Sequence, residues 1–313
     1  MIAIIAKHQE LPRERAKLYE HATKVLCHHW DLTGKHIIPA KMPANFTMWE
    51  DDKLELLRKI AWRMQAGEKG FAGNFILSDD LHDEIAKYLE NRWGLSKVEI
   101  GLISHGIVAQ LRERNFILCF YGAQLYGFVH RTFLEYFCAA EIVYRFEKQQ
   151  TLSIEKLKTN IFLAHFRDET WHEVLRLICG MIEPHFTGEL INIIASSRES
   201  SYETNILQLV RQFLNEVVEI DKRNTKIFQN ISSLLQKIAI DDEKNPVIRG
   251  IAIDTLVKNY TNLPDTNQFI WRIVTNEEEC IMIHNAAMMA IKEYYSQISN
   301  ILPPLDQILT DRS

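Results

Sequence analysis

Residues 116–129 are the one stretch of this 313-residue chain in which the apolar pattern changes from a helical to a strand-like period. Two short runs, 116–120 and 125–129, are rich in aromatic and β-branched side chains, and Gly122 lies between them. Such runs around a turn glycine predict a β-hairpin. Elsewhere apolar residues recur three or four positions apart, which is the period of an amphipathic helix. The chain is therefore predicted to be mainly α-helical.

Three helices are predicted before the hairpin and one after it. They are expected at about 47–66, 78–92, 97–114 and 132–147. Polar residues stand at their starts, where Asp79 and Asp80 would complement the helix dipole. Three helices, a hairpin and a further helix are the element order of a winged helix-turn-helix. We therefore expect a winged-helix domain over residues 46–148.

Beyond residue 148 the pattern shows only helices. Amphipathic segments of ordinary length follow one another with short loops, and the last of them are expected at 246–260, 265–275 and 280–297. The helix that begins at Val247 resembles the one that begins at Met282, and an acidic loop precedes each. Repeated helix pairs are the mark of an α-solenoid. Residues 149–313 are thus predicted to form a domain of HEAT-like helix pairs.

Residues 1–45 are expected to hold the end of a helical linker domain and a loop. An apolar run begins directly at Met1 without a capping residue, as though its helix started upstream. A second helix opens near Pro12, and the stretch from Asp31 to Asn45 contains one glycine and two prolines without helical periodicity. We interpret that stretch as the loop.

Composition narrows the classes of function. The formal net charge is −5, so no global positive field announces a nucleic-acid-binding protein. No run is long and apolar enough for a membrane span, and five scattered cysteines without a Cys-x-x-Cys pair are typical of reduced thiols. A cytoplasmic location is expected. Four tryptophans fall on or beside apolar helix faces and are predicted to pack in cores: Trp49, Trp62, Trp93 and Trp171.

A search for catalytic motifs finds none. The phosphate-binding Gly-x-x-x-x-Gly-Lys-[Ser/Thr] loop is absent, and the glycines at 67, 70 and 73 follow a helix rather than a strand, so a plain loop is the better interpretation. The His-rich segment around Cys27 is the densest candidate metal site. Adjacent residues on a helix diverge by about 100°, however, so Cys27, His28 and His29 cannot face one ion. We expect no metal site and no catalytic residue.

His130 is the exception among the histidines. With Arg131 it lies where the predicted hairpin ends and the next helix begins. A helix N-terminus attracts anions, and imidazole adds a donor whose charge changes near neutral pH. Two interpretations stay open from the residues alone: a structural histidine at a tight junction, or a phosphate contact.

A family resemblance bears on this choice. The segment 128–140 reads Phe-Val-His-Arg-Thr-Phe-Leu-Glu-Tyr-Phe-Cys-Ala-Ala. It resembles the winged-helix signature of NACHT-type STAND NTPases, the group that includes the NOD-like receptors. Residues 10–20 are similar to the segment that follows the nucleotide-binding core in bacterial members. The C-terminal helices are similar to their HEAT-like repeats.

The resemblance implies a regulatory and sensor portion of a signal-transduction switch. In that family the winged-helix histidine, here His130, contacts the β-phosphate of bound ADP. The Walker A and Walker B motifs lie upstream in the family, and this chain begins after them. The resemblance thus implies that the chain alone binds no ADP or ATP, is not an enzyme, acts through protein partners, among them a separate nucleotide-binding half, and is a monomer in isolation.

Two alternatives remain. Winged helices also bind DNA, and the predicted third helix offers a few polar groups for that purpose, namely Lys97, Gln110, Arg112 and Arg114. Glu99 and Glu113 oppose them, which leaves little charge to neutralise phosphates. The other alternative is an inactive remnant of a truncated gene.

Overall fold

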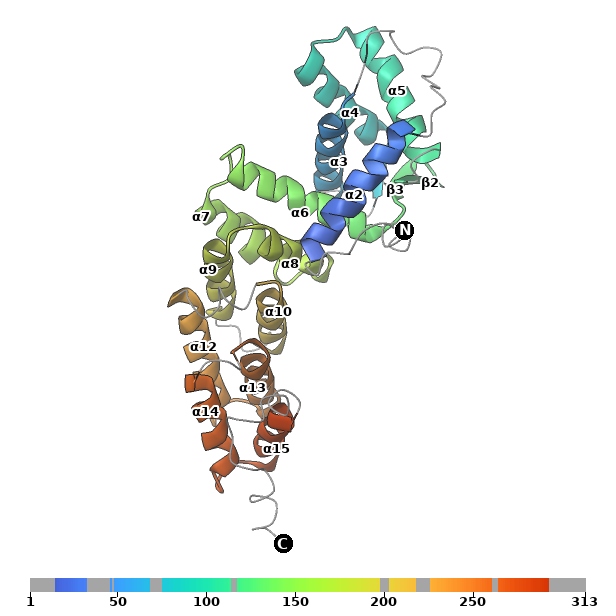
Figure 1. Cartoon of the computed structure of the whole chain (residues 1–313). Helices are drawn as coiled ribbons and strands as arrows, with labels where there is room; N and C mark the ends of the chain where they lie inside the picture. The colour runs from blue at the N-terminus through green and yellow to red at the C-terminus, as the bar shows by residue number, and fades with distance from the viewer. Residues whose placement is uncertain are drawn as a thin grey trace. The chain divides into compact units, whose positions relative to one another are not determined.

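The computed structural model describes residues 15–32, 46, 48–67, 75–113, 117–197, 203–217, 226–260 and 264–292. It divides into two compact units, residues 1–182 and 183–313. In the described residues the chain is mainly helical, with a small antiparallel sheet (Figure 1). No described helix is both long and apolar enough to cross a bilayer.

The first unit contains one sheet and most of the long helices. Its elements are α2 (Arg15–Leu32), α3 (Glu50–Gln65), β1 (Phe75–Leu77), α4 (Ser78–Trp93), α5 (Lys97–Glu113), β2 (Leu118–Gly122), β3 (Leu125–Phe128), α6 (Arg131–Glu147), α7 (Ile154–Lys156), the π-helix η1 (Leu157–Leu163), the 3₁₀ turn η2 (Glu169–Trp171) and α8 (His172–Met181). The predicted hairpin and its four flanking helices are confirmed within a few residues.

Strand β1 is an element that the apolar pattern did not predict. It pairs antiparallel with β3, with Ile76 opposite Tyr126, and β3 pairs antiparallel with β2, so that the strand order is β1-β3-β2. Ile76 and Tyr126 are both buried. The strand lies between α3 and α4, next to the glycine-containing loop, whose residues 68–74 lie outside the described part of the chain.

Helix α6 supplies the core of this unit. Nearly its whole N-terminal half is buried, including Phe133, Leu134 and Phe137, and it packs against α3, α8, α2 and β3. Because α8 packs on α6, the first unit extends to Ile182. The domain boundary that we expected at residue 148 therefore falls inside this unit.

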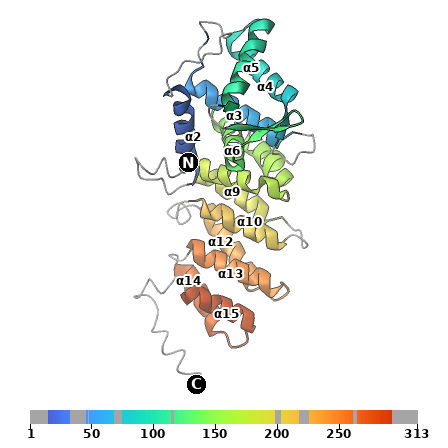
Figure 2. The ribbon, with the colours of Figure 1, turned by 90° about the vertical axis from the view of Figure 1, so that its right-hand side faces the viewer.

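The second unit consists of helices in the described residues. They are α9 (Pro184–Ala195), α10 (Glu203–Asn215), α12 (Lys226–Ala239), α13 (Pro246–Tyr260), α14 (Pro264–Thr275) and α15 (Ile281–Ala290). Consecutive helices pair, and α13 packs against both α10 and α15, while α12 packs against α9 (Figure 2). Gly188 permits the close approach of α9 and α12, because a Cβ there would lie 2.4 Å from Cγ2 of Ile227.

The turn of the hairpin contains three consecutive residues with positive φ. Gly122 has φ of 85°, Ala123 of 48° and Gln124 of 63°. A tight two-residue turn between antiparallel strands favours this backbone, but only glycine adopts it without a steric cost. The carbonyl oxygen of Gln124 accepts a hydrogen bond of 2.7 Å from the backbone N–H of Ser78, which ties the turn to the start of α4.

Replacement of Ala123 by glycine should raise the free energy of unfolding by about 1 kcal/mol, because glycine removes the left-handed penalty. The measurement is chemical denaturation followed by circular dichroism. The matched control is Ala164→Gly, an exposed site with φ of −71°, where the same change should lower stability. A decrease for Ala123→Gly as large as that of the control would contradict this account of the turn.

Candidate functional site

His130 lies on the surface at the junction of β3 and α6. Its backbone is extended, with φ of −121° and ψ of 121°, and its carbonyl oxygen accepts a hydrogen bond of 3.0 Å from the N–H of Phe133. The imidazole is exposed, and its centroid is 6.0 Å from that of the Phe133 ring. His130 is thus the N-cap residue of α6, although its side chain forms no capping hydrogen bond.

The residues around His130 fix its position from both sides. On the strand side, the N–H of Val129 donates to the carbonyl of Ile117 at 2.9 Å, and the Phe128 side chain is buried with its ring 6.0 Å from that of Phe137. On the helix side, Phe133 is buried. The backbone at His130 therefore has little freedom, while its side chain faces solvent.

Arg131, the neighbour of His130, is occupied by protein groups. Its Nε donates to Oε1 of Glu135 at 2.8 Å, and its Nη2 donates to the carbonyl oxygen of Thr170 at 3.2 Å. The same carbonyl accepts a bond of 3.1 Å from Nε2 of Gln65. Burial raises the pKa of Glu135, and the Arg131 guanidinium opposes that increase. Arg131 therefore anchors α6 to the segment before α8, and His130 is the better placed of the two for an external ligand.

The first turn of α6 can act as an anion site in chemical terms. The N–H groups of a helix's first turn lack intrahelical acceptors and carry partial positive charge. The N–H of Phe133 already donates to the His130 carbonyl, whereas Arg131 and Thr132 are exposed, so their N–H groups are the donors that lie beside the imidazole. The arrangement can present several donors to a phosphate oxygen. The first turn contains no carboxylate that would repel an anion.

The exposed part of α5 is apolar rather than basic. Val98 is 75% exposed and Leu102 is 41% exposed, and Gly101 and His105 are exposed beside them. Lys97 and Arg112, the two exposed cations, stand near opposite ends of the helix. A recognition helix needs clustered cations and amide side chains to contact phosphates and bases. The surface of α5 lacks this pattern.

His82 on α4 and His105 on α5 form a stacked pair, with ring centroids 4.3 Å apart. Nδ1 of His82 is 2.7 Å from the hydroxyl oxygen of Ser104, which is buried. Burial lowers the pKa of His82 below 6.5, and the neighbouring His105 lowers it further. Protonation of His82 would therefore weaken the contact between α4 and α5.

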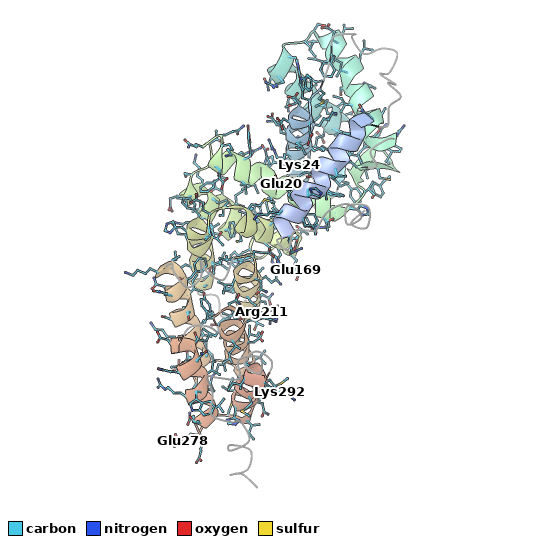
Figure 3. All side chains as sticks on the ribbon, in the orientation of Figure 1. Glu20, Lys24, Glu169, Arg211, Glu278 and Lys292 are labelled. Atoms are coloured by element: carbon cyan, nitrogen blue, oxygen red, sulfur yellow. The ribbon has the colours of Figure 1, made fainter. Side chains whose placement is uncertain are left out.

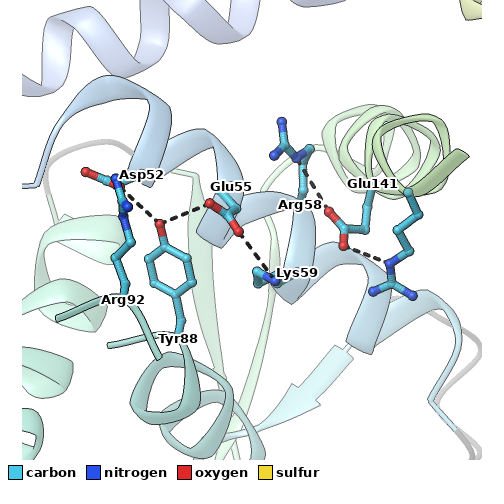
Figure 4. Close-up of polar contacts among 8 residues, drawn as sticks. Asp52, Glu55, Arg58, Lys59, Tyr88, Arg92 and Glu141 are labelled. Atoms are coloured by element: carbon cyan, nitrogen blue, oxygen red, sulfur yellow. Dashed lines mark hydrogen bonds and ion pairs between the residues drawn. The ribbon is translucent and has the colours of Figure 1, made fainter. Parts of the chain in front are cut away.

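A polar network on α3 is built for structure (Figure 4). The Asp52 carboxylate is buried and receives hydrogen bonds from Nε of Arg92 at 3.0 Å, from the Tyr88 hydroxyl at 3.3 Å and from the Trp49 N–H at 3.1 Å. Burial and the nearby Glu55 and Asp52 carboxylates raise the pKa of Tyr88. Because each acceptor already has donors, the cluster fixes α3 against α4.

Glu141 forms a second buried ion cluster, between α3 and α6. Its side chain is 2% exposed, and its carboxylate lies 2.9 Å from Nε of Arg145 and 3.5 Å from Nε of Arg58. The Arg58 guanidinium also lies over the Tyr144 ring, and that of Arg145 over the Trp62 ring. Glu141 is thus paired with two arginines, and the cluster holds α3 against α6.

The four tryptophans predicted to pack in cores differ in burial, and Trp62 and Trp93 are partly exposed. Trp171 is buried and stacks on His165 at 3.9 Å, with the Trp62 ring 6.3 Å away. Trp49 is 71% exposed, so the prediction that it packs in the core is wrong. Trp49 is the N-cap residue of α3, and its side chain forms no capping hydrogen bond. Helical periodicity cannot be extended to a residue before the helix begins.

Metal binding is not evident in the described residues. They contain no group of three His, Cys, Asp or Glu side chains that could hold an ion. The His-rich segment lies in α2, and the side chains from residue 26 to residue 32, including those of Cys27, His28 and His29, lie outside the described part. Cys119, Cys138, Cys179 and Cys280 are free thiols.

Comparison with known proteins yields no relative. No family model matches the chain, and no curated protein or solved structure matches it significantly.

The stability of the first unit should decrease as the pH falls through about 6.5, the ordinary pKa of histidine. The folded-state pKa of His82 is lower than the unfolded value, so its neutral form stabilises the fold above that pH and protonation weakens it below. Urea unfolding between about pH 8 and pH 5 measures this effect. His82→Gln should show a smaller decrease than the wild type.

Ser104→Ala is the control for this measurement. It removes the hydrogen-bonding partner of His82 but retains the titrating ring, so the pH-dependent decrease should persist while stability falls at every pH. If the free energy of unfolding fell equally with pH in the wild type and in His82→Gln, His82 would not be the group whose protonation destabilises the fold.

Proposed function

We propose that this chain is the regulatory and sensor portion of a NACHT-type switch protein. The observation that carries the proposal is the exposed His130 at the end of the three-stranded sheet and at the start of α6. The order α3-β1-α4-α5-β2-β3, with strand order β1-β3-β2, supports a winged helix-turn-helix as its setting. The added strand β1 makes that arrangement more complete than the hairpin alone.

In this proposal His130 contacts the β-phosphate of ADP, and another polypeptide segment holds the rest of the nucleotide. The imidazole and the first-turn N–H groups of α6 would supply donors to one face of the phosphate. Closing the nucleotide between two segments would favour the inactive state. The chain alone, without a phosphate-binding loop, would neither bind ADP tightly nor hydrolyse ATP.

The second unit serves as the sensor in this proposal. The pairing of consecutive helices, with α10, α13 and α15 packed in succession, supports HEAT-like repeats. Such repeats present an extended surface to protein partners. The isolated chain is expected to be a monomer, because assembly in this family depends on the nucleotide-binding half.

The alternative functions have less support. DNA binding would require a basic recognition helix, whereas the exposed part of α5 is apolar. The hypothesis of an inactive remnant predicts no interaction for His130. Measurement of ADP retention by the His130→Ala variant therefore separates it from the switch proposal.

The decisive variant for the switch is His130→Ala. The chain would be co-expressed with a NACHT-type nucleotide-binding segment, and the ADP that co-purifies would be measured by chromatography after denaturation. We expect the variant to retain about tenfold less ADP, because one charge-assisted or neutral donor to phosphate is lost. The fold should be unaffected, since the imidazole is exposed.

His185→Ala is the matched control, because His185 is also an exposed histidine at the start of a helix, α9, but in the second unit. It should retain ADP like the wild type. Equal loss in both variants, no loss in His130→Ala, or metal-dependent ATP turnover by the chain alone would contradict the proposal.

The purified chain should show none of the salt-dependent binding to duplex DNA that a DNA-binding winged helix would show. A gel shift at about 50 mM and about 200 mM salt tests this expectation, since a protein that neutralises several phosphates loses affinity steeply over that range. A salt-dependent shift that is abolished by Lys97→Ala together with Arg112→Ala would instead favour the winged-helix DNA-binding alternative.

A further inference from the structure

Two loops of the second unit meet at a single buried arginine. Arg249 on α13 is 5% exposed in its side chain. Its Nε donates to the carbonyl oxygen of Ala239, at the end of α12, at 2.9 Å, and its Nη1 lies 3.0 Å from the Asp242 carboxylate. Its Nη2 donates to both carboxylate oxygens of Glu279, before α15, at 2.7 and 2.8 Å. Loops 240–245 and 276–280 are therefore neighbours on one edge of this unit.

Large apolar side chains are exposed on the same edge. They flank the residues that Arg249 joins, and they are Ile240 at 55%, Val247 at 50%, Ile281 at 78% and Met282 at 58% exposed. Val247 and Met282 occupy equivalent positions in the two similar helices of the sequence. Isolated exposed apolar residues need no explanation, but four around adjoining loops, two of them at equivalent positions, indicate an interaction surface.

The charge of this edge is strongly negative. Loops 240–245 and 276–280 carry six acidic residues, Asp241, Asp242, Glu243, Glu277, Glu278 and Glu279, against one lysine, Lys244. Lys244 forms an ion pair with Glu203 of α10, and the buried Arg249 forms ion pairs with Asp242 and Glu279. Among the described cations none pairs with Glu243, Glu277 or Glu278, and these three acids are exposed. Figure 3 shows Glu278 at the loop that follows α14.

We infer that this loop edge docks a basic amphipathic segment of a partner protein. Exposed apolar residues would receive the apolar side of that segment, and the unpaired acids would face its lysines and arginines. Charge favours such a partner over the other occupants. A second copy carries a net charge of −5, and residues 293–313 of this chain carry three acids against one arginine, so both would bring further negative charge to the acidic loops.

This inference rests on the proposed sensor role of the second unit and specifies the partner chemistry that the role requires. Its readout is separate from that of the switch, because neither nucleotide nor His130 takes part. Peptide binding that fails while ADP retention still depends on His130 would overturn the docking inference alone. The converse result would overturn the switch alone.

The test uses the full chain and a helical peptide of about 18 residues with leucines at i, i+3, i+4 and i+7 and lysines elsewhere. Fluorescence anisotropy at about 150 mM salt gives the dissociation constant. Glu277→Lys with Glu278→Lys should raise it at least about tenfold, and so should Ile281→Ser with Met282→Ser. All four side chains are exposed, so the variants should fold, as thermal melts would verify.

Val98→Ser with Leu102→Ser is the matched control, because it removes exposed apolar side chains from α5 in the first unit. It should bind like the wild type. A peptide with serine in place of leucine should bind at least about tenfold more weakly, since lysines alone do not satisfy the apolar surface. Equal affinity for both peptides, equal affinity of all variants, or no binding would overturn the inference. A dimer that the Ile281 and Met282 changes dissociate in sedimentation would also overturn it.

Discussion

The burial of helix α6 is the constraint on which the first unit depends. Its N-terminal half is enclosed by α3, α8, α2 and the sheet, and a helix that is apolar on most sides must lie inside a protein. The buried Glu141 is tolerated there because Arg58 and Arg145 neutralise it. The buried α6 on one side and the paired β3 on the other fix the backbone of His130 between them, and its side chain is exposed.

The amphipathic helices and the hairpin could be predicted from the sequence, because their patterns are formed by residues that lie close together in the chain. Helices with a wide apolar stripe and polar starts, such as α4 and α10, reveal their period over several turns. The hairpin was found because its two strands are adjacent in the chain. Strand β1 was not found, because three residues are too few to show alternation and its partner β3 lies about 50 residues away.

Pairs that are distant in the chain explain the other differences. The sequence pattern gives no sign that Asp52, at the start of α3, is buried, because its partners Arg92 and Tyr88 lie about 40 residues away. In the same way, nothing near Arg249 in sequence reveals that Glu279 accepts its guanidinium. The candidate site fared differently: His130 was identified from its junction and from the family resemblance, while the role of its neighbour Arg131 became visible only with Thr170 and Gln65 in place.

The two units combine different chemistry. The first holds a surface imidazole on a rigid core, and the second joins acidic loops around a buried arginine. The proposed switch needs both a residue that contacts the nucleotide and a surface that binds a partner protein. The most direct test is the affinity for ADP of this chain combined with a NACHT-type nucleotide-binding segment, measured for the wild type and for His130→Ala. The account predicts an affinity about tenfold lower in the variant. Equal affinities in the two proteins would contradict the role of His130 in a nucleotide switch.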